Sequence, residues 1–85
     1  MNLSDILPKL RWQCRRGMLE LDVLLGQFLE EAYLGLNPED QLIFANLLKC
    51  NDQELFYWFT GQKEPDDPQL AAMVKKVKQH ANNRH

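Results

Sequence analysis

Five segments with helical periodicity, separated by glycine, proline and capping residues, constrain the fold of this chain more than any other feature. Within these segments, apolar residues recur at intervals of three, four and seven, which places them on one side of an α-helix. The alternation of apolar and polar residues that marks a half-buried strand is almost absent. The sequence therefore predicts an all-α fold, a compact five-helix bundle with short loops.

Each predicted helix starts at a capping residue or follows a glycine that ends the helix before it. Gly17 ends the first helix, because glycine adopts a left-handed backbone without strain. The first predicted helix is capped by Ser4 and Asp5 and has Pro8 in its opening turn, and the second covers residues 18–33. The third covers residues 38–49 and is opened by Asn37-Pro38. The fourth extends from the Asn51/Glu54 capping box to Thr60, and the fifth from Asp67-Pro68 to Ala81. The wide apolar arc of the third helix, from Leu42 to Leu48, predicts that it is central.

The length of the chain limits it to one domain. Its 85 residues, 45% of them apolar, suffice for one hydrophobic core but not for a large enclosed active site. We expect residues 1–85 to form a single helical domain with a frayed tail over 82–85. No stretch approaches the roughly 20 apolar residues of a membrane helix, and no targeting segment is recognisable, so we expect a cytoplasmic protein without membrane insertion.

The apolar stripes of the five segments predict the core. Cys14 and Cys50 are expected to be reduced core thiols, because no CxxC motif or neighbouring histidine completes a metal set. No metal site is expected. The residues predicted to be buried are Leu7, Leu10, Cys14, Met18, Leu21, Leu25, Phe28, Leu29, Ala32, Leu42, Ile43, Phe44, Leu47, Leu48, Leu55, Phe56, Trp58, Phe59, Leu70, Met73, Val74 and Val77, with Tyr57 or Trp58 partly exposed.

Charge is distributed unevenly along the chain. Residues 1–16 carry a net charge of +3, residues 17–67 of −9 and residues 68–85 of +4. If the two ends fold near each other, the molecule presents opposite potentials on two sides, which suits oriented docking to a protein; the alternative is chance scatter. The acidic centre argues against nucleic acid as a partner.

Residues suited to catalysis do not converge in this sequence, so we expect no enzymatic activity and no catalytic residue. His80 and His85 are expected to be solvated histidines near the end of the chain. The adjacent acids Glu30 and Glu31 are expected to point in different directions.

The segment from Arg15 to Asp22 allows two interpretations. In the first it is a helix junction, in which Gly17 turns the chain and Glu20 reaches back to unpaired backbone N–H groups. In the second it is a docking site, in which a guanidinium beside Glu20 and Asp22 is held by a carboxylate and aimed outward. Trp12, on the same side of the preceding helix as the arginines, either belongs to this site or packs on a neighbouring helix.

The same segment carries a resemblance to a known family. The run CRRGMLELD at 14–22 and the run NPEDQLIFANLLKCNDQELFYWF at 37–59 resemble the SdhE/YgfY family of FAD assembly factors, over about residues 3–80. The family's RGxxE motif is Arg16-Gly17-Met18-Leu19-Glu20 here. Trp12, Cys14, Arg15, Asp22 and the Leu-Phe-x-Trp run at 55–58 strengthen the match.

The resemblance implies a five-helix factor that promotes covalent attachment of FAD to the flavoprotein subunit of succinate dehydrogenase, and in some bacteria of fumarate reductase. It implies that the flavoprotein holds the FAD and supplies the chemistry, so the factor binds no cofactor stably; direct contact with FAD is left open. The absence of a presequence points to a bacterial member, and we expect a monomer. The implied partner-binding residues are Arg16, Gly17 and Glu20, with Met18 and Asp22 beside them and Lys9, Trp12 and Arg15 on the preceding helix.

Two other functions are compatible with the residues. A regulatory or antitoxin-like protein-binding module, also proposed for members of this family, would use the same surfaces with a different partner. A helical nucleic-acid binder would use the basic ends of the chain. The negative charge of the central segment argues against this function.

Overall fold

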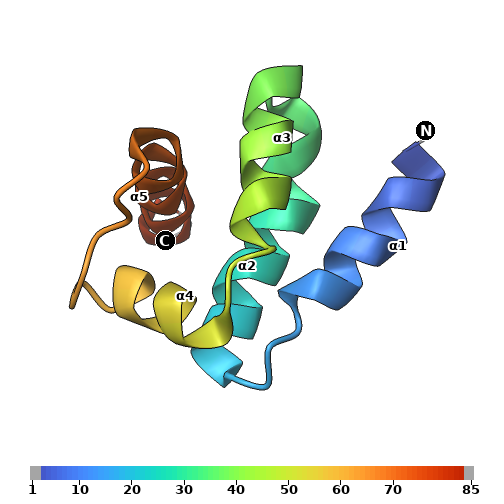
Figure 1. The fold of residues 1–85 in the computed structure, drawn as a ribbon. Helices are drawn as coiled ribbons and strands as arrows, with labels where there is room; N and C mark the ends of the chain where they lie inside the picture. The colour runs from blue at the N-terminus through green and yellow to red at the C-terminus, as the bar shows by residue number, and fades with distance from the viewer. Residues whose placement is uncertain (1–2, 84–85) are drawn as a thin grey trace.

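The computed structural model describes residues 3–83, with side chains from Ile6 onward, and over this range it contains helices and no strand. The helices are α1 (Leu3–Cys14), α2 (Leu19–Ala32), the 3₁₀ helix η1 (Tyr33–Gly35), α3 (Pro38–Leu47), α4 (Asp52–Phe59) and α5 (Pro68–Asn82). The prediction of an all-α, five-helix fold is confirmed, and the connections between the α-helices are short (Figure 1).

Helix α2 is the central helix of the molecule. It packs against α1 on one side and α5 on the other, α4 crosses near its N-terminal end, and α3 runs beside α5 (Figure 1). The prediction that the third helix is central was wrong, because its apolar arc is wider than the surface it buries and Leu42 remains 62% exposed. Over residues 3–83, no helix has both the length and the apolar character needed to cross a membrane.

Local capping explains where three of the helices begin. The side chains of Asn37, Asn51 and Asp67 each accept a backbone N–H at a distance of 2.8 Å, at the starts of α3, α4 and α5 respectively. The amide of Asn51 also donates to the carboxylate of Glu54 at 3.0 Å, so the two side chains bind each other. These predicted helix starts are confirmed.

The start of α1 differs from the prediction. The helix already includes Leu3, so Ser4 and Asp5 lie within it and do not precede it, and Pro8 lies beyond its opening turn. The side chains of residues 4 and 5 lie outside the described part of the structure. Proline removes one hydrogen bond from the helix. Packing of Leu10 and Cys14 in the core offsets that loss, because tertiary contacts supply most of a helix's stability in a folded protein.

One hydrophobic core joins the five α-helices. Phe44 of α3 lies within ring-contact distance of two aromatic side chains, Phe28 at 5.2 Å and Tyr33 at 5.9 Å between centroids. Most predicted core positions are confirmed. The exceptions are Leu42 and Phe56, which are exposed, and Cys50, which is only half-buried. The buried set is Leu10, Cys14, Leu21, Leu25, Phe28, Leu29, Tyr33, Phe44, Leu47, Leu48, Leu55, Met73, Val74 and Val77.

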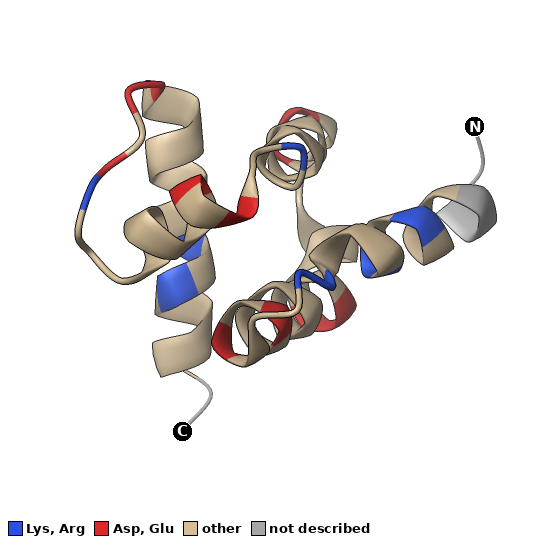
Figure 2. Cartoon of the chain, turned by 60° about the horizontal axis from the view of Figure 1, so that its bottom comes forward, with Lys and Arg blue, Asp and Glu red and all other residues tan. Residues whose placement is uncertain are grey.

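Charges that are separated along the sequence are paired in space. Opposite potentials on two sides of the molecule were expected only if the two basic ends folded near each other. Helices α1 and α5 instead lie on opposite sides of α2, so this condition is not met (Figures 1 and 2). Basic side chains of both ends instead pair with acidic ones of the centre. The ion pairs are Arg11–Glu30, Arg16–Asp52 at 3.2 Å and Lys76–Asp40 at 2.7 Å.

His80 is half-buried and not solvated as predicted. Its Nε2 atom lies 2.8 Å from a carboxylate oxygen of Glu31, and its ring meets that of Phe28 edge-on at 5.6 Å. His85 lies outside the described residues. Because Glu31 points to α5 and Glu30 points to Arg11 of α1, the prediction that these adjacent acids diverge is confirmed.

Candidate functional site

The connection between α1 and α2 turns on Gly17. Its φ angle of 78° lies in the left-handed region, as the sequence predicted for the end of the first helix. Apart from Gly17 and its two chain neighbours, no residue has an atom within 4 Å of the position that a Cβ atom would take, so the backbone angle and not a lack of space requires glycine here. Met18 follows as the N-cap of α2 and makes no side-chain capping bond.

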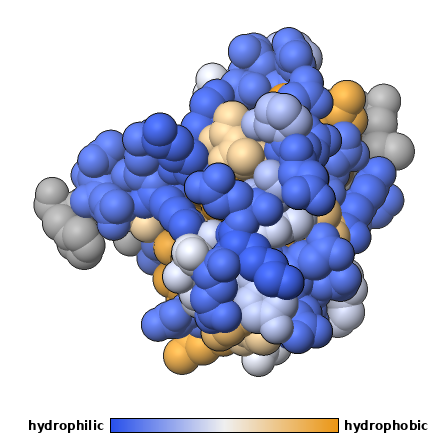
Figure 3. Space-filling view, turned by 60° about the vertical axis from the view of Figure 1, so that its left-hand side comes forward, coloured by the Kyte–Doolittle hydropathy of each residue, from blue (hydrophilic) through white to orange (hydrophobic). Residues whose placement is uncertain are grey.

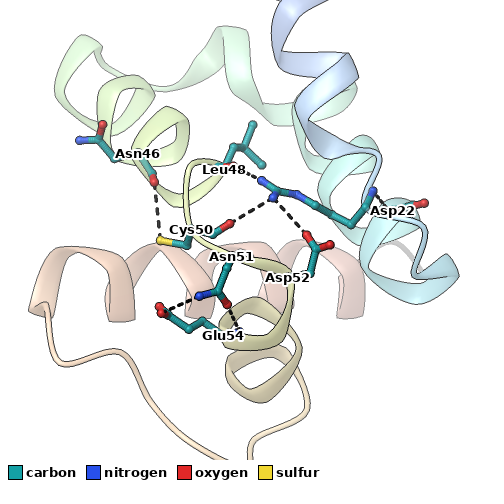
Figure 4. A network of polar contacts seen from close by, with 8 residues as sticks. Asp22, Asn46, Leu48, Cys50, Asn51, Asp52 and Glu54 are labelled. Carbon is teal, nitrogen blue, oxygen red and sulfur yellow. Dashed lines mark hydrogen bonds and ion pairs between the residues drawn. The ribbon is translucent and has the colours of Figure 1, made fainter.

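The guanidinium of Arg16 fixes this connection to a distant part of the chain. It donates to the backbone carbonyls of Leu48 and Cys50, the latter at 3.1 Å, and lies 3.2 Å from the carboxylate of Asp52 (Figure 4). The side chain of Arg16 is only 14% exposed. It therefore clamps the α1–α2 connection onto the end of α3 and the start of α4.

The orientation of Arg16 corrects the docking interpretation of the sequence. That interpretation has a guanidinium beside Glu20 and Asp22 aimed outward, whereas the guanidinium of Arg16 is directed inward and paired with Asp52. Only its backbone N–H reaches Asp22, whose carboxylate accepts it at 2.6 Å. Asp22, and not Glu20, thus makes the contact that reaches back to the junction.

The side chain of Glu20 is exposed, and its carboxylate makes no hydrogen bond or ion pair with any described residue between 3 and 83. Its place in the first turn of α2, three residues after Gly17, fixes the direction of its backbone. The predicted motif residues therefore divide into two groups. Arg16 and Asp22 build the corner, whereas Gly17, Met18 and Glu20 form its outer surface.

Three further predicted site residues lie on or just after α1. Lys9 and Trp12 are three residues apart and share one side of the helix, and Arg15 follows its end. All three are exposed, Trp12 by 74%, so the alternative in which Trp12 packs on a neighbouring helix is excluded. Among residues 3–83, the charged groups of Lys9 and Arg15 have no ion-pair or hydrogen-bond partner. No polar contact joins them to Glu20.

An apolar groove lies beside Glu20, between the start of α2 and α4. It has a volume of about 250 Å³ and is lined by Met18, Leu19, Leu24, Phe56 and Phe59 among others. Leu19 is 79% exposed at its edge. Figure 3 shows a mostly hydrophilic face with apolar surface exposed at its lower edge. Helix α4 and the start of α2 lie at the same lower level of the molecule in Figure 1.

Sequence reasoning missed this groove. Phe56 and Phe59 were assigned to the core, because a spacing pattern cannot show where α4 leaves its neighbours uncovered. A usable signal was present in α2, where Leu19 and Val23 are four residues apart and lie off the predicted core stripe. An apolar pair of this kind on a helix surface indicates a contact site.

Cys14, the last residue of α1, is buried close to this corner. Burial raises the pKa of Cys14 to about 11, an effect that the nearby charge of Arg16 only partly offsets. A thiol with a raised pKa is a poor nucleophile at neutral pH. Between residues 3 and 83, no group of three His, Cys, Asp or Glu side chains converges to hold a metal ion.

Comparison with known proteins gives one consistent result. Residues 8–81 match the family described as "Flavinator of succinate dehydrogenase". The FAD assembly factor SdhE of Shewanella oneidensis is 49% identical over 81 residues, covering 95% of this chain and 98% of the relative. SdhE of Pseudomonas aeruginosa is 52% identical over 71 residues, 84% of each chain, and SdhE of Photobacterium profundum is 43% identical over 81 residues, 95% of this chain and 92% of the relative.

Proposed function

This chain belongs to the SdhE family of FAD assembly factors, and from that membership we propose that it binds the flavoprotein subunit of succinate dehydrogenase and promotes covalent attachment of FAD to it. The flavoprotein holds the FAD and supplies the reacting groups. The factor, acting as a monomer without a cofactor of its own, supplies a rigid surface that holds the immature flavoprotein in a reactive arrangement. The flavoprotein of fumarate reductase is a second proposed partner.

The environment of Glu20 supports this residue as part of the binding surface in the proposal. Its carboxylate is exposed, lacks a partner among residues 3–83 and lies at the edge of an apolar groove. A charged acceptor next to apolar surface binds a partner's donor strongly once water is displaced. In this proposal Glu20 accepts hydrogen bonds from the flavoprotein, while Met18 and Leu19 contact its apolar surface.

Arg16 has a positioning role in the proposal. Its guanidinium donates hydrogen bonds to the carbonyls of Leu48 and Cys50, so these N–H groups are not offered to the flavoprotein. By clamping the connection before α2, it fixes the position from which Glu20 and the Gly17 turn meet the partner. Preorganisation of this kind reduces the entropy lost on binding.

Covalent flavinylation can be measured directly by in-gel fluorescence of the denatured flavoprotein, after incubation with FAD and the factor. We expect Glu20→Gln to lower the initial rate about tenfold or more, since a charge-assisted hydrogen bond contributes about 1.5–3 kcal/mol. Glu39→Gln is the matched control, because Glu39 occupies the same position in the first turn of α3, is exposed and has no partner over residues 3–83.

Two results test this proposal, and the first also decides between it and the regulatory alternative. Flavinylation that proceeds equally with and without the wild-type factor would contradict the proposal. Equal rates with Glu20→Gln and Glu39→Gln would remove Glu20 from the interface, while a dependence on the wild-type factor would still support the assembly function.

A further inference from the structure

The apolar groove beside Glu20 is one end of a longer surface depression. Leu24, Phe59 and Thr60 line both this groove and a second hollow that reaches Ala81 and Asn82 at the end of α5. A third hollow, against Val23, shares Leu24 with the other two. The three form one trough across α2, α4 and α5, defined here as the α2–α5 trough by Leu19, Val23, Leu24, Phe56, Phe59 and Ala81.

The exposed apolar side chains of the trough do not serve the core. The buried residues of α2 are Leu21, Leu25, Phe28 and Leu29, whereas Leu19 and Val23 lie on another side of the helix. Val23 is 44% exposed, and both side chains leave apolar surface in water. Contiguous exposed apolar surface of this kind is typical of an interaction site.

The two ends of the trough carry opposite charges. Glu20 lies at the α2 end, and Lys78 of α5 lines the hollow at the other end. Neither side chain has an ion-pair or hydrogen-bond partner in the stretch from residue 3 to residue 83. Lys76, two residues earlier on α5, is by contrast paired with Asp40 at 2.7 Å. The unpaired charges at the ends therefore give the trough a direction.

We propose that the α2–α5 trough binds one amphipathic segment of the flavoprotein, with its apolar side chains against Leu19, Val23 and Phe59. A basic residue of that segment lies near Glu20 and an acidic residue near Lys78, because only this direction pairs both charges. The occupant is a segment of the flavoprotein because the trough is continuous with the surface around Glu20. The inference rests on the proposed function and extends its interface from the motif to α5.

Affinity measurements with paired variants test the trough. The affinity for the flavoprotein lacking covalent FAD is measured by isothermal titration calorimetry. We expect Val23→Asp and Lys78→Glu each to weaken binding by about tenfold or more, since each places an unfavourable charge in the interface. Circular dichroism checks that both variants remain folded.

The controls use the same changes outside the trough. Leu42→Asp adds a charge at an exposed leucine of α3, and Lys75→Glu reverses a charge on α5 that does not line the trough. Both are expected to bind within about twofold of wild type. If Val23→Asp and Lys78→Glu bind as tightly as these controls, the trough is not the docking site, although wild-type binding still supports the proposed function. If wild type does not bind, both proposals fail.

Photocrosslinking tests the single segment and its direction. A benzophenone side chain is placed at position 23 or position 82, and the crosslinked flavoprotein peptides are identified by mass spectrometry. We expect both positions to label one contiguous segment, with a basic residue nearer the adduct from position 23 and an acidic residue nearer that from position 82. Adducts on two unrelated surfaces, or the opposite order of charges, would overturn the proposal.

Discussion

The guanidinium of Arg16 donates a hydrogen bond of 3.1 Å to the backbone carbonyl of Cys50, 34 residues further along the chain. It also donates to the carbonyl of Leu48, so one side chain satisfies two acceptors where α3 ends. Carbonyls at a helix C-terminus carry partial negative charge, which favours a cation at this place. The arginine of the family motif therefore holds the fold of the site together.

Arg16→Ala is expected to lower the free energy of unfolding by about 2–3 kcal/mol, because it leaves carbonyls at the end of α3 without their charged donor. Urea denaturation followed by circular dichroism measures the change. Arg16→Lys keeps the charge but loses the planar fork of donors, so we expect it to recover only part of the loss. Arg15→Ala, at an exposed arginine without a partner over residues 3–83, should change stability by less than about 0.5 kcal/mol. Equal losses for Arg15→Ala and Arg16→Ala would contradict the clamp.

The same substitution at two glycines is expected to have opposite effects. Gly17→Ala should destabilise the fold by about 1–2 kcal/mol, because its φ of 78° is left-handed and strained for alanine. Gly26→Ala, inside α2, should stabilise it by about 0.5–1 kcal/mol, because alanine is the better helix residue. At either glycine, no atom outside the local backbone and the two chain neighbours lies within 4 Å of the place that an alanine Cβ would occupy, so steric clash does not enter the comparison. Thermal unfolding of both variants tests the sign of the change in stability. A stabilising effect of Gly17→Ala would refute the argument from the backbone angle.

Trp12→Ala is expected to reduce affinity for the flavoprotein without reducing stability. The indole is 74% exposed, so its removal deletes little buried surface, whereas exposed tryptophan is a frequent contributor to binding energy. Titration calorimetry and urea denaturation measure the two effects on the same variant. Leu42→Ala, at a residue 62% exposed on α3, is the matched control. A loss of stability with unchanged affinity would assign Trp12 to the fold and not to the interface.

The two thiols are expected to react at different rates. Cys14 is buried and Cys50 is half-buried, and neither forms a disulfide. With a thiol-specific reagent at mildly alkaline pH, one thiol per folded chain should react, and mass spectrometry should identify it as Cys50. Both should react in concentrated urea. Rapid modification of Cys14 in the folded protein would show that the contact between α1 and α2 opens readily.

The raised pKa of Cys14 also makes stability depend on pH. Burial raises this pKa from its usual 9.0 to about 11, so the folded chain holds the thiol proton more tightly than the unfolded chain. The resulting stabilisation is complete below pH 9 and is lost as the pH rises to about 11. Cys14→Ala lacks this contribution. The difference in unfolding free energy between wild type and this variant should therefore narrow over that range, and a constant difference would contradict the assignment.

Features that depend on neighbouring residues were predicted well from the sequence. Asn37, Asn51 and Asp67 cap helices at the predicted places, and Gly17 has the predicted left-handed backbone. These features follow from hydrogen bonds and backbone angles that span at most a few residues. The family motif could likewise be located from the sequence. For Glu20, the sequence left two alternatives open, a contact with the junction or an exposed position in a docking site.

Features that depend on distant residues were not predictable in the same way. The exposure of Leu42 and Phe56 and the pairing of His80 with Glu31 differ from the predictions. The inward direction of Arg16 was one of two alternatives that the sequence left open.

The sequence by itself determined that this chain forms five helices, where most of them begin and end, and which corner carries the motif, because capping and periodicity act over single turns of the chain. Only the tertiary structure decided that Arg16 serves the fold while Glu20 faces outward, and that α2, α4 and α5 together form an apolar trough. The reason is that a side chain's direction is settled by the acceptors and apolar surfaces that folding brings to it, and for Arg16 these lie more than 30 residues away.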